Sequence, residues 1–159
     1  DYWSKVFSTQ ADSEYYQEKT RDLVAEALWK AKEYDINKVG VIDFVDEGGK
    51  VSVLGEYMAA RVTAEVANKR PLRVAQQGEI KDLLAKLALQ PSQLYSKNDI
   101  KKIGEGLGSQ ALMTGKLTDL GTNIDVLVTM IDVASGEVIA SATASLTRTK
   151  FAVEMLRHY

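Results

Sequence analysis

The sequence of 159 residues contains no cysteine, only two prolines and a single histidine. The absence of cysteine excludes disulfides, thiolate metal sites and a cysteine nucleophile. The histidine, His158, is the penultimate residue, where a chain end is expected to fray. Neither a G-x-S-x-G nor an H-E-x-x-H motif accompanies it. The sequence therefore offers no serine triad and no histidine metal site.

The sequence also lacks a long apolar run and an excess of basic charge. No stretch approaches the ~18 apolar residues of a spanning helix, so no transmembrane segment is expected. The 20 basic residues are scattered among 22 acidic ones and the net charge is −2, which argues against a nucleic-acid or anionic-membrane surface. Because the chain starts at Asp1 and not at methionine, we expect a processed or shortened form whose upstream signal peptide or lipid-anchor cysteine is not visible.

What is present indicates one globular domain, since 45% of the residues are hydrophobic. Apolar residues at helical spacing predict helices over 12–35, about 53–69 with Ser52 as N-cap, the region of Ile80–Leu87, and the segment that follows Ser96. Short apolar or alternating runs predict strands at 38–45, 72–75, 110–118, 123–133 and 137–147, and residues 149–158 form a last short helix. The order α-β-α-β-α-α-β-β-β-α predicts an α/β fold of the α+β type. It has a mixed sheet, with one βαβ unit followed by an antiparallel meander and with helices packed on the sheet.

A glycine-rich stretch, "IKKIGEGLGSQALMTGKL" (100–117), raises the question of a phosphate site. A dinucleotide motif needs its glycines between a strand and the start of a helix, whereas here the helix comes first and the strand follows. The Gly115-Lys116 pair lacks both the first glycine and the Ser or Thr of a Walker motif. We therefore interpret Gly108 as the residue that ends the helix and Gly104 as a site of close packing. No cofactor is expected.

The acidic residues of "IDFVDEGG" (42–49) give a weaker signal for chemistry. Asp43, Asp46 and Glu47 do not have the spacing of an EF-hand, and Asp46 and Glu47 are typical of a turn, so no metal site is predicted. Asp43 ends a predicted strand, where α/β folds can hold a catalytic carboxylate. A small hydrolase or ligand-binding domain that uses Asp43 therefore stays open as an alternative, although no catalytic residue is assigned.

Aromatic residues near the start of the chain are the candidates for an interaction surface. Trp3, Tyr15 and Tyr16 lie in or before the first predicted helix, and Tyr and Trp are enriched at binding hot spots. Trp29 lies near the apolar stripe of the same helix and is expected in the core. The predicted interaction residues are therefore Trp3, Tyr15 and Tyr16, and the predicted contact surfaces are the exposed faces of the first helix and the edge of the meander.

Three motifs in order carry a resemblance to a known family: "LGEYMAARVTAEVA", "DIKKIGEGLGSQALMTGKLTDLG" and "IDVASGEVIASATASL". They resemble the FlgO-type domain of flagellar outer-membrane proteins. The wider group also contains the curli-secretion protein CsgG, the lipoprotein activators of penicillin-binding proteins and the N-terminal domain of TolB. The resemblance covers about residues 36–148, so the expected organisation is a helical extension (1–35), an α/β domain (36–148) and a short tail (149–159).

This resemblance implies an exported, non-enzymatic protein of the bacterial periplasm or outer membrane. Its expected partners are envelope proteins, flagellar or of another surface assembly, and membrane association would come only through an upstream lipid anchor. It supplies no catalytic residues, and the membrane-spanning insertions of the curli pore are missing. The leading hypothesis is therefore an interaction domain in the assembly of flagella or another surface structure. The alternative is an activator or regulator of a cell-wall synthesis enzyme, and homo-oligomerisation stays open.

Overall fold

The computed structural model describes the backbone of residues 2–158 and the side chains of residues 11–158. Helices and strands follow one another in the predicted order: α1 (Tyr2–Lys30), β1 (Lys38–Val41), α2 (Val53–Ala67), β2 (Arg73–Val74), α3 (Gln77–Lys86), α4 (Lys97–Leu107), β3 (Ala111–Asp119), β4 (Asn123–Asp132), β5 (Val138–Thr147) and α5 (Lys150–Met155). Among the described residues, no helix is both long enough and apolar enough to cross a membrane.

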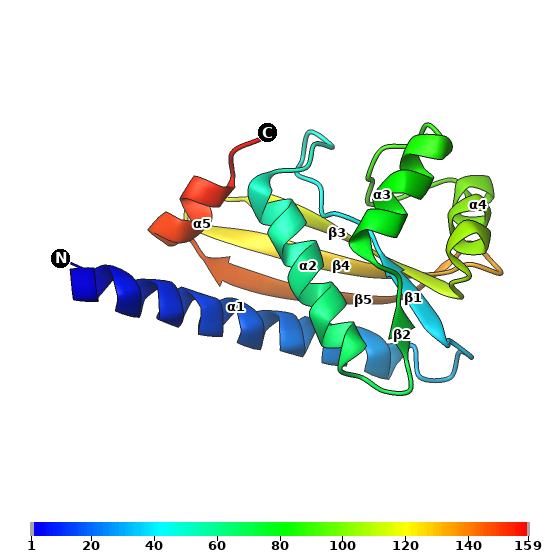
Figure 1. The fold of residues 1–159 in the computed structure, drawn as a ribbon, viewed down its shortest axis with the longest axis horizontal. Coiled ribbons are helices and arrows are strands. Elements are labelled where there is room, and N and C mark those ends of the chain that lie inside the picture. The colour runs from blue at the N-terminus through cyan, green and yellow to red at the C-terminus, as the bar shows by residue number, and fades with distance from the viewer. Residues whose placement is uncertain (1, 159) are drawn as a thin grey trace.

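The sheet is mixed, as the sequence predicts, with the strand order β2-β1-β3-β4-β5. Strand β1 pairs in parallel with β2 and with β3, and β3, β4 and β5 form an antiparallel meander. Figure 1 shows α2 crossing the sheet and α1 running along β5, while α5 lies at the opposite end of the molecule from α3 and α4. Strand β5 is therefore an edge strand, and α1 is its neighbour.

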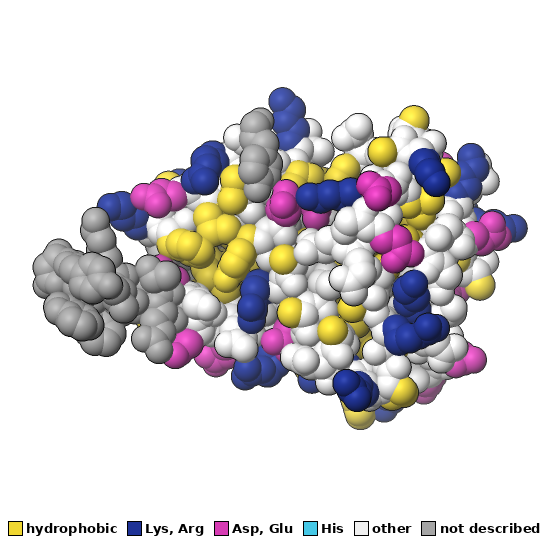
Figure 2. Space-filling view, in the orientation of Figure 1, with side chains coloured by type: hydrophobic (Ala, Val, Ile, Leu, Met, Phe, Trp, Pro, Cys, Tyr) yellow, Lys and Arg dark blue, Asp and Glu magenta, His cyan; other side chains and the backbone are white. Residues whose placement is uncertain are grey.

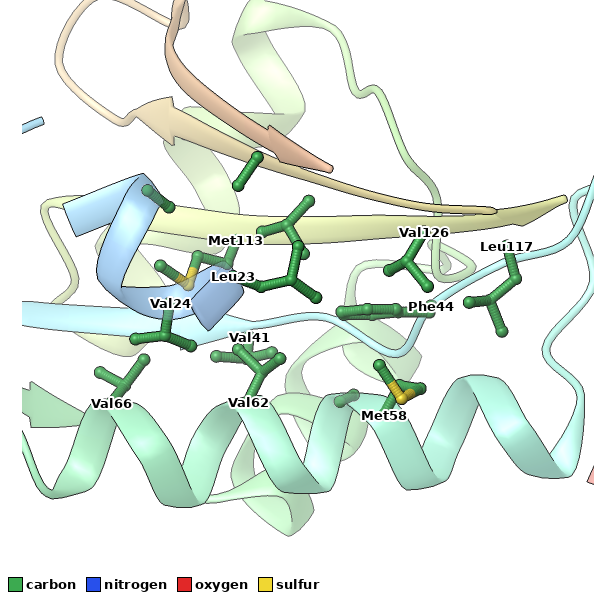
Figure 3. Packing of buried hydrophobic residues seen from close by; sticks show 14 of the residues in the cluster. Leu23, Val24, Val41, Phe44, Met58, Val62, Val66, Met113, Leu117 and Val126 are labelled. Carbon is green, nitrogen blue, oxygen red and sulfur yellow. The ribbon is translucent and has the colours of Figure 1, made fainter. Parts of the chain in front are cut away.

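The two faces of the sheet carry different cores. On the first face, side chains of α1, α2 and α5 pack against apolar residues of β1, β3, β4 and β5. In Figure 3 the ring of Phe44 lies in this core between Met58 of α2 and Val126 of β4. On the second face, α3 and α4 cover Leu112 and Ile131. Further along this face, Asp125 of β4 and Thr143 and Ser145 of β5 are exposed.

The helix ends follow local capping chemistry. The hydroxyl oxygens of Ser52 and Ser96 accept hydrogen bonds from the N–H groups of Gly55 and Asp99, both at 3.1 Å, and so start α2 and α4. At the end of α4, Gly108 adopts a left-handed conformation with φ 65°, as a glycine at this position commonly does. Both serine caps and the glycine helix end are confirmed.

Several element boundaries differ from the sequence prediction, and the largest differences are in α1, which also ends at Lys30 and not at 35, and in β1. Helix α1 starts at Tyr2, ten residues before the predicted start at 12, because no proline or glycine interrupts residues 2–30. Strand β1 ends at Val41, since the N–H of Phe44 donates to the carbonyl of Gly55 in α2 and leaves the ladder. Beyond that break, Val45 forms one isolated bridge with Lys116.

A bulge in the β4–β5 pairing corrects one further detail. The register shifts between Met130 and Ile131, so Val138 pairs with Ile131 on the second face. Strict alternation along β5 would place Val138 on the same face as Ala140 and Leu146. Because of the bulge, Val138 instead lies outside the first-face core and is 51% exposed.

Candidate interaction surface

Four aromatic rings meet where α1, α2 and α5 join. The ring centre of Tyr16 lies 5.8 Å from that of Tyr15, 5.6 Å from that of Tyr57 and 5.6 Å from that of Phe151. The Tyr15 and Tyr57 rings stand nearly perpendicular to that of Tyr16, an edge-to-face arrangement that aromatic pairs favour. The cluster therefore ties the N-terminal helix to the rest of the fold.

Tyr16 lies at the centre of this cluster and is fully buried. Its prediction as a contact residue was therefore wrong, because the rings of its three neighbours shield it from solvent. Burial raises the pKa of the Tyr16 hydroxyl to about 12. A group in this position stabilises the fold and is not available to a partner.

The other three rings are only partly buried, and we call them the aromatic surface (Tyr15, Tyr57 and Phe151). Figure 2 shows hydrophobic side chains gathered on this side of the molecule, between α1, α2 and α5. Tyr15 is held in place because its hydroxyl oxygen accepts a hydrogen bond of 2.9 Å from the N–H of Thr147 in β5. The structure thus brings the predicted Tyr15 together with two rings from distant parts of the sequence.

The two tryptophans of the prediction have different outcomes. Trp29 is 68% exposed, so its expected place in the core was wrong. The buried stripe of α1 consists of Leu23, Val24 and Ala27, and Trp29 points away from that stripe with the ammonium of Lys32 3.5 Å from its ring centre. The side chain of Trp3 lies outside the described residues.

The end of β1 does not form a substrate cavity at Asp43. The adjoining space, lined by residues that include Gln77, Lys81 and Pro91, has a volume of only about 20 Å³. This volume holds about one water molecule. Burial raises the pKa of Asp43, and the positive charge of Lys81 opposes this shift. The alternative of a hydrolase that uses Asp43 gains no support from this geometry.

A shallow crevice lies at the carboxyl ends of the parallel part of the sheet, with a volume of about 320 Å³. Its wall includes Asp46, Asp119 and the apolar Leu156. Both aspartates are already bonded: the Nε2 atom of His158 lies 2.6 Å from Asp46, and Arg148 pairs with Asp119 at 3.0 Å. Sequence reasoning missed the first of these contacts, because it treated His158 as frayed and nothing local links residues 46 and 158.

The geometry of the glycine-rich stretch does not favour phosphate binding. Helix α4 ends in this stretch, so its C-terminus and not its N-terminus faces the glycines, and that end carries partial negative charge. A Cβ atom on Gly104 would collide with Val133, which confirms that this glycine permits close packing. Among the described residues, no group of three or more metal-binding side chains comes together.

Several solved structures share this fold at low sequence identity. The C-terminal domain of LpoB from Escherichia coli superimposes with a TM-score of 0.67 at 13% identity, over 84% of this chain and 98% of that domain. The same domain from Salmonella enterica gives a TM-score of 0.62 at 14% identity, over 81% of this chain and 96% of that one. The lipoprotein GNA1162 from Neisseria meningitidis gives 0.55 at 16% identity, over 72% and 82%.

These likenesses establish an LpoB-like fold. No protein-family model matches the chain, and no curated protein matches its sequence. The narrower resemblance to FlgO-type domains stays a prediction from the sequence.

Proposed function

We propose that this chain is a non-enzymatic interaction domain of the bacterial cell envelope that regulates a cell-wall synthesis enzyme. The observation that carries the proposal is the agreement in fold with the LpoB C-terminal domain over nearly the whole of that domain. The motifs in the sequence independently indicate the group that contains the lipoprotein activators of penicillin-binding proteins. Together these two observations favour the regulatory hypothesis over flagellar assembly.

The proposed contact region is the aromatic surface. Partly exposed tyrosine and phenylalanine rings bury a large apolar area at low entropic cost when a partner covers them. Tyr15 is fixed by its bond to Thr147, and the rings of Tyr57 and Phe151 are 6.0 Å apart at their centres. Such a rigid, preformed surface loses little conformational freedom on binding.

The proposed location follows from the same reasoning. A regulator of cell-wall synthesis has to reach enzymes that work outside the cytoplasmic membrane, so the domain would lie in the periplasm or at the outer membrane. A lipid anchor on a segment upstream of Asp1 would hold it there. An epitope-tagged full-length precursor that fractionated with the cytoplasm would argue against this location.

The decisive experiment adds the purified chain to each purified penicillin-binding protein of the same organism. Glycan polymerisation and peptide cross-linking are measured with and without the chain, and complex formation is measured by surface plasmon resonance. We expect one enzyme to be bound and its rate to change. If no enzyme responds and a flagellar component binds instead, the proposal is wrong and the FlgO prediction takes its place.

A pair of matched variants tests the contact region. Tyr57→Arg places a charge on the aromatic surface and should weaken binding at least about tenfold, as truncation or disruption of a central interface residue commonly does. Leu94→Arg makes the same kind of change at a side chain that is 61% exposed in the α3–α4 connection, and it should leave binding unchanged. Melting curves of both variants establish that each is folded.

A further inference from the structure

The outer edge of β5 is fixed to α1 at two points. The Nζ atom of Lys30 donates a hydrogen bond of 2.7 Å to the carbonyl oxygen of Ser141. The N–H of Thr147 donates to the hydroxyl oxygen of Tyr15 at 2.9 Å. Both backbone groups therefore point away from β4 and toward the outside of the sheet.

The backbone between these two points is open. In an antiparallel pair, alternate residues direct their N–H and C=O groups to opposite sides of the strand. The β4–β5 pairing is regular from Thr147 to Ala140, so Thr143 and Ser145 point outward in the same way as Ser141 and Thr147. Both are exposed, and within the described part of the chain no hydrogen bond reaches their backbone groups from outside the sheet. Such an edge is a template for an additional strand.

A groove lies beside this open stretch on the second face of the sheet. It has a volume of about 620 Å³, and its lining includes Thr143, Ser145, Leu127 and Asp125. The strand register places Leu127 opposite Thr143 and Asp125 opposite Ser145. A strand added at this edge would direct every second side chain to this face, next to the hydroxyl groups of Thr143 and Ser145. The open edge and the groove thus converge on the same two residues.

The opposite side of the open stretch carries charges of both signs. Tyr15, Lys19, Asp22, Glu26 and Lys30 recur every three or four residues, so they lie along one side of α1. The first and last of them bind β5, which places Lys19, Asp22 and Glu26 along the stretch between the two anchors. The Nζ atom of Lys19 lies over the Tyr15 ring, 5.4 Å from its centre. Glu26 pairs with Lys30 at 2.8 Å, and Asp22 is exposed and has no ion pair with any described side chain.

From these observations we infer that β5 binds an extended segment of a protein partner, which adds a strand at Thr143–Ser145 and carries Lys or Arg where it faces Asp22. Main-chain hydrogen bonds to Thr143 and Ser145 would hold the segment, and its alternate side chains would occupy the groove. The inference rests on the proposed function only in that the partner is a protein. It does not require that partner to be a cell-wall enzyme.

The test selects a ligand from a displayed library of random ten-residue peptides, with the full chain as the target. We expect the enriched peptides to share a Lys or Arg at the position that faces Asp22. In ¹⁵N-resolved NMR, an enriched peptide should shift the amide signals of Thr143 and Ser145 and slow their hydrogen exchange. Failure to enrich any peptide over an uncoated surface, or signals that shift only on the aromatic surface, would overturn the inference.

Three variants locate the site. Thr143→Pro removes an outward N–H that the β4–β5 ladder does not use, and prolines are tolerated at such edge positions, so the fold should persist. It should weaken peptide binding by about tenfold, the effect of one good hydrogen bond, whereas Thr143→Ala keeps the N–H and should bind within about twofold of the original. Asp22→Lys reverses an exposed charge and should also weaken binding of a basic peptide. This variant keeps the test decisive if the proline variant does not fold.

The outcomes separate this inference from the proposed function. If a cell-wall enzyme is stimulated by the chain and no peptide binds at Thr143 and Ser145, the proposed function stands and strand addition is wrong. If peptides bind the edge and no cell-wall enzyme responds, strand addition stands and the proposed function is wrong.

Discussion

The glycine at position 115 should be among the least replaceable residues of the sheet. Gly115 lies in the middle of β3, and the fully buried ring of Phe44 packs directly on it. A Cβ atom built on Gly115 would overlap three ring carbons of Phe44, the Cγ, Cδ1 and Cδ2 atoms. The carbonyl oxygen of Phe44 in turn lies against Gly55 in α2, so the backbone of Phe44 cannot move away without displacing the helix, and its ring is enclosed by the core residues Met58 and Val126.

We therefore expect Gly115→Ala to destabilise the protein by about 3 kcal/mol, the upper part of the range for an overpacked core. For a domain of this size, each kcal/mol lowers the melting temperature by ~2–4 °C, so the expected loss is roughly 6–12 °C. Urea denaturation followed by far-UV circular dichroism gives the free energy of unfolding, and a calorimetric scan gives the melting temperature.

A matched control makes the same chemical change where there is room. Gly78 lies in the first turn of α3, and a Cβ atom there would meet nothing within 4 Å. Gly78→Ala should stabilise the protein by about 0.5–1 kcal/mol, because alanine loses less backbone entropy in a helix. The reasoning is refuted if Gly115→Ala is as stable as the original. It is also refuted if Phe44→Leu, which makes space over Gly115, does not reduce the cost of the added methyl group in a double-mutant cycle.

Three further predictions concern single side chains. Tyr16→Ala should lower the free energy of unfolding by about 3–5 kcal/mol, as for other buried aromatic residues. Trp29→Ala should change it by less than about 0.5 kcal/mol, because Trp29 is exposed. Equal losses for the two variants in urea denaturation would contradict the assignment of Tyr16 to the core and Trp29 to the surface. The hydrogen bond from Arg148 holds the pKa of Asp119 below its ordinary value, so Asp119 should stabilise the fold above the carboxyl's unfolded pKa, and this contribution is lost as the pH falls through the lowered value. In a ¹³C NMR titration, Arg148→Gln should move the pKa of Asp119 upward. Burial raises the pKa of Asp43, so its ionised form costs stability at neutral pH. Asp43→Asn should therefore be at least as stable as the original at pH 7, and this advantage should vanish as the pH falls through the raised pKa to the ordinary carboxyl value. A loss of stability at pH 7 would count against this sign.

The sequence is informative about the fold wherever the deciding interactions are local. Ser52 and Ser96 start helices through bonds to residues three positions away, and Gly108 ends one through its own backbone conformation. The meander follows in the same way from alternating runs and tight turns. The end of β1 is different, since the bond from Phe44 to Gly55 depends on how α2 docks. A continuous apolar run cannot show where its pairing stops.

The candidate surface was less accessible to sequence reasoning, because it is made by contacts between distant residues. Tyr15 and Tyr16 are adjacent and chemically alike, but adjacent residues point to different sides of a helix. The side chain of Tyr16 is therefore buried, whereas that of Tyr15 is partly exposed. The sequence does carry a signal for Trp29, which is six positions from Leu23 and two from Ala27, a spacing that lies outside the buried stripe of the helix. No local pattern connects Tyr15 with Phe151.

The open stretch of β5 shows what can be gained when sequence and structure are combined. The alternation of Thr143 and Ser145 with buried alanines indicates a one-sided strand, but it says nothing about whether the strand is central or at an edge. Once the strand order places β5 at the edge, the bonds from Lys30 and Tyr15 identify which backbone groups point outward. Edge strands are generally protected against association with other strands. The bonds from Lys30 and Tyr15 occupy only the ends of the β5 edge and leave the backbone between them unpaired. An edge that is covered at both ends and open between them is consistent with binding one short segment while resisting indefinite strand addition.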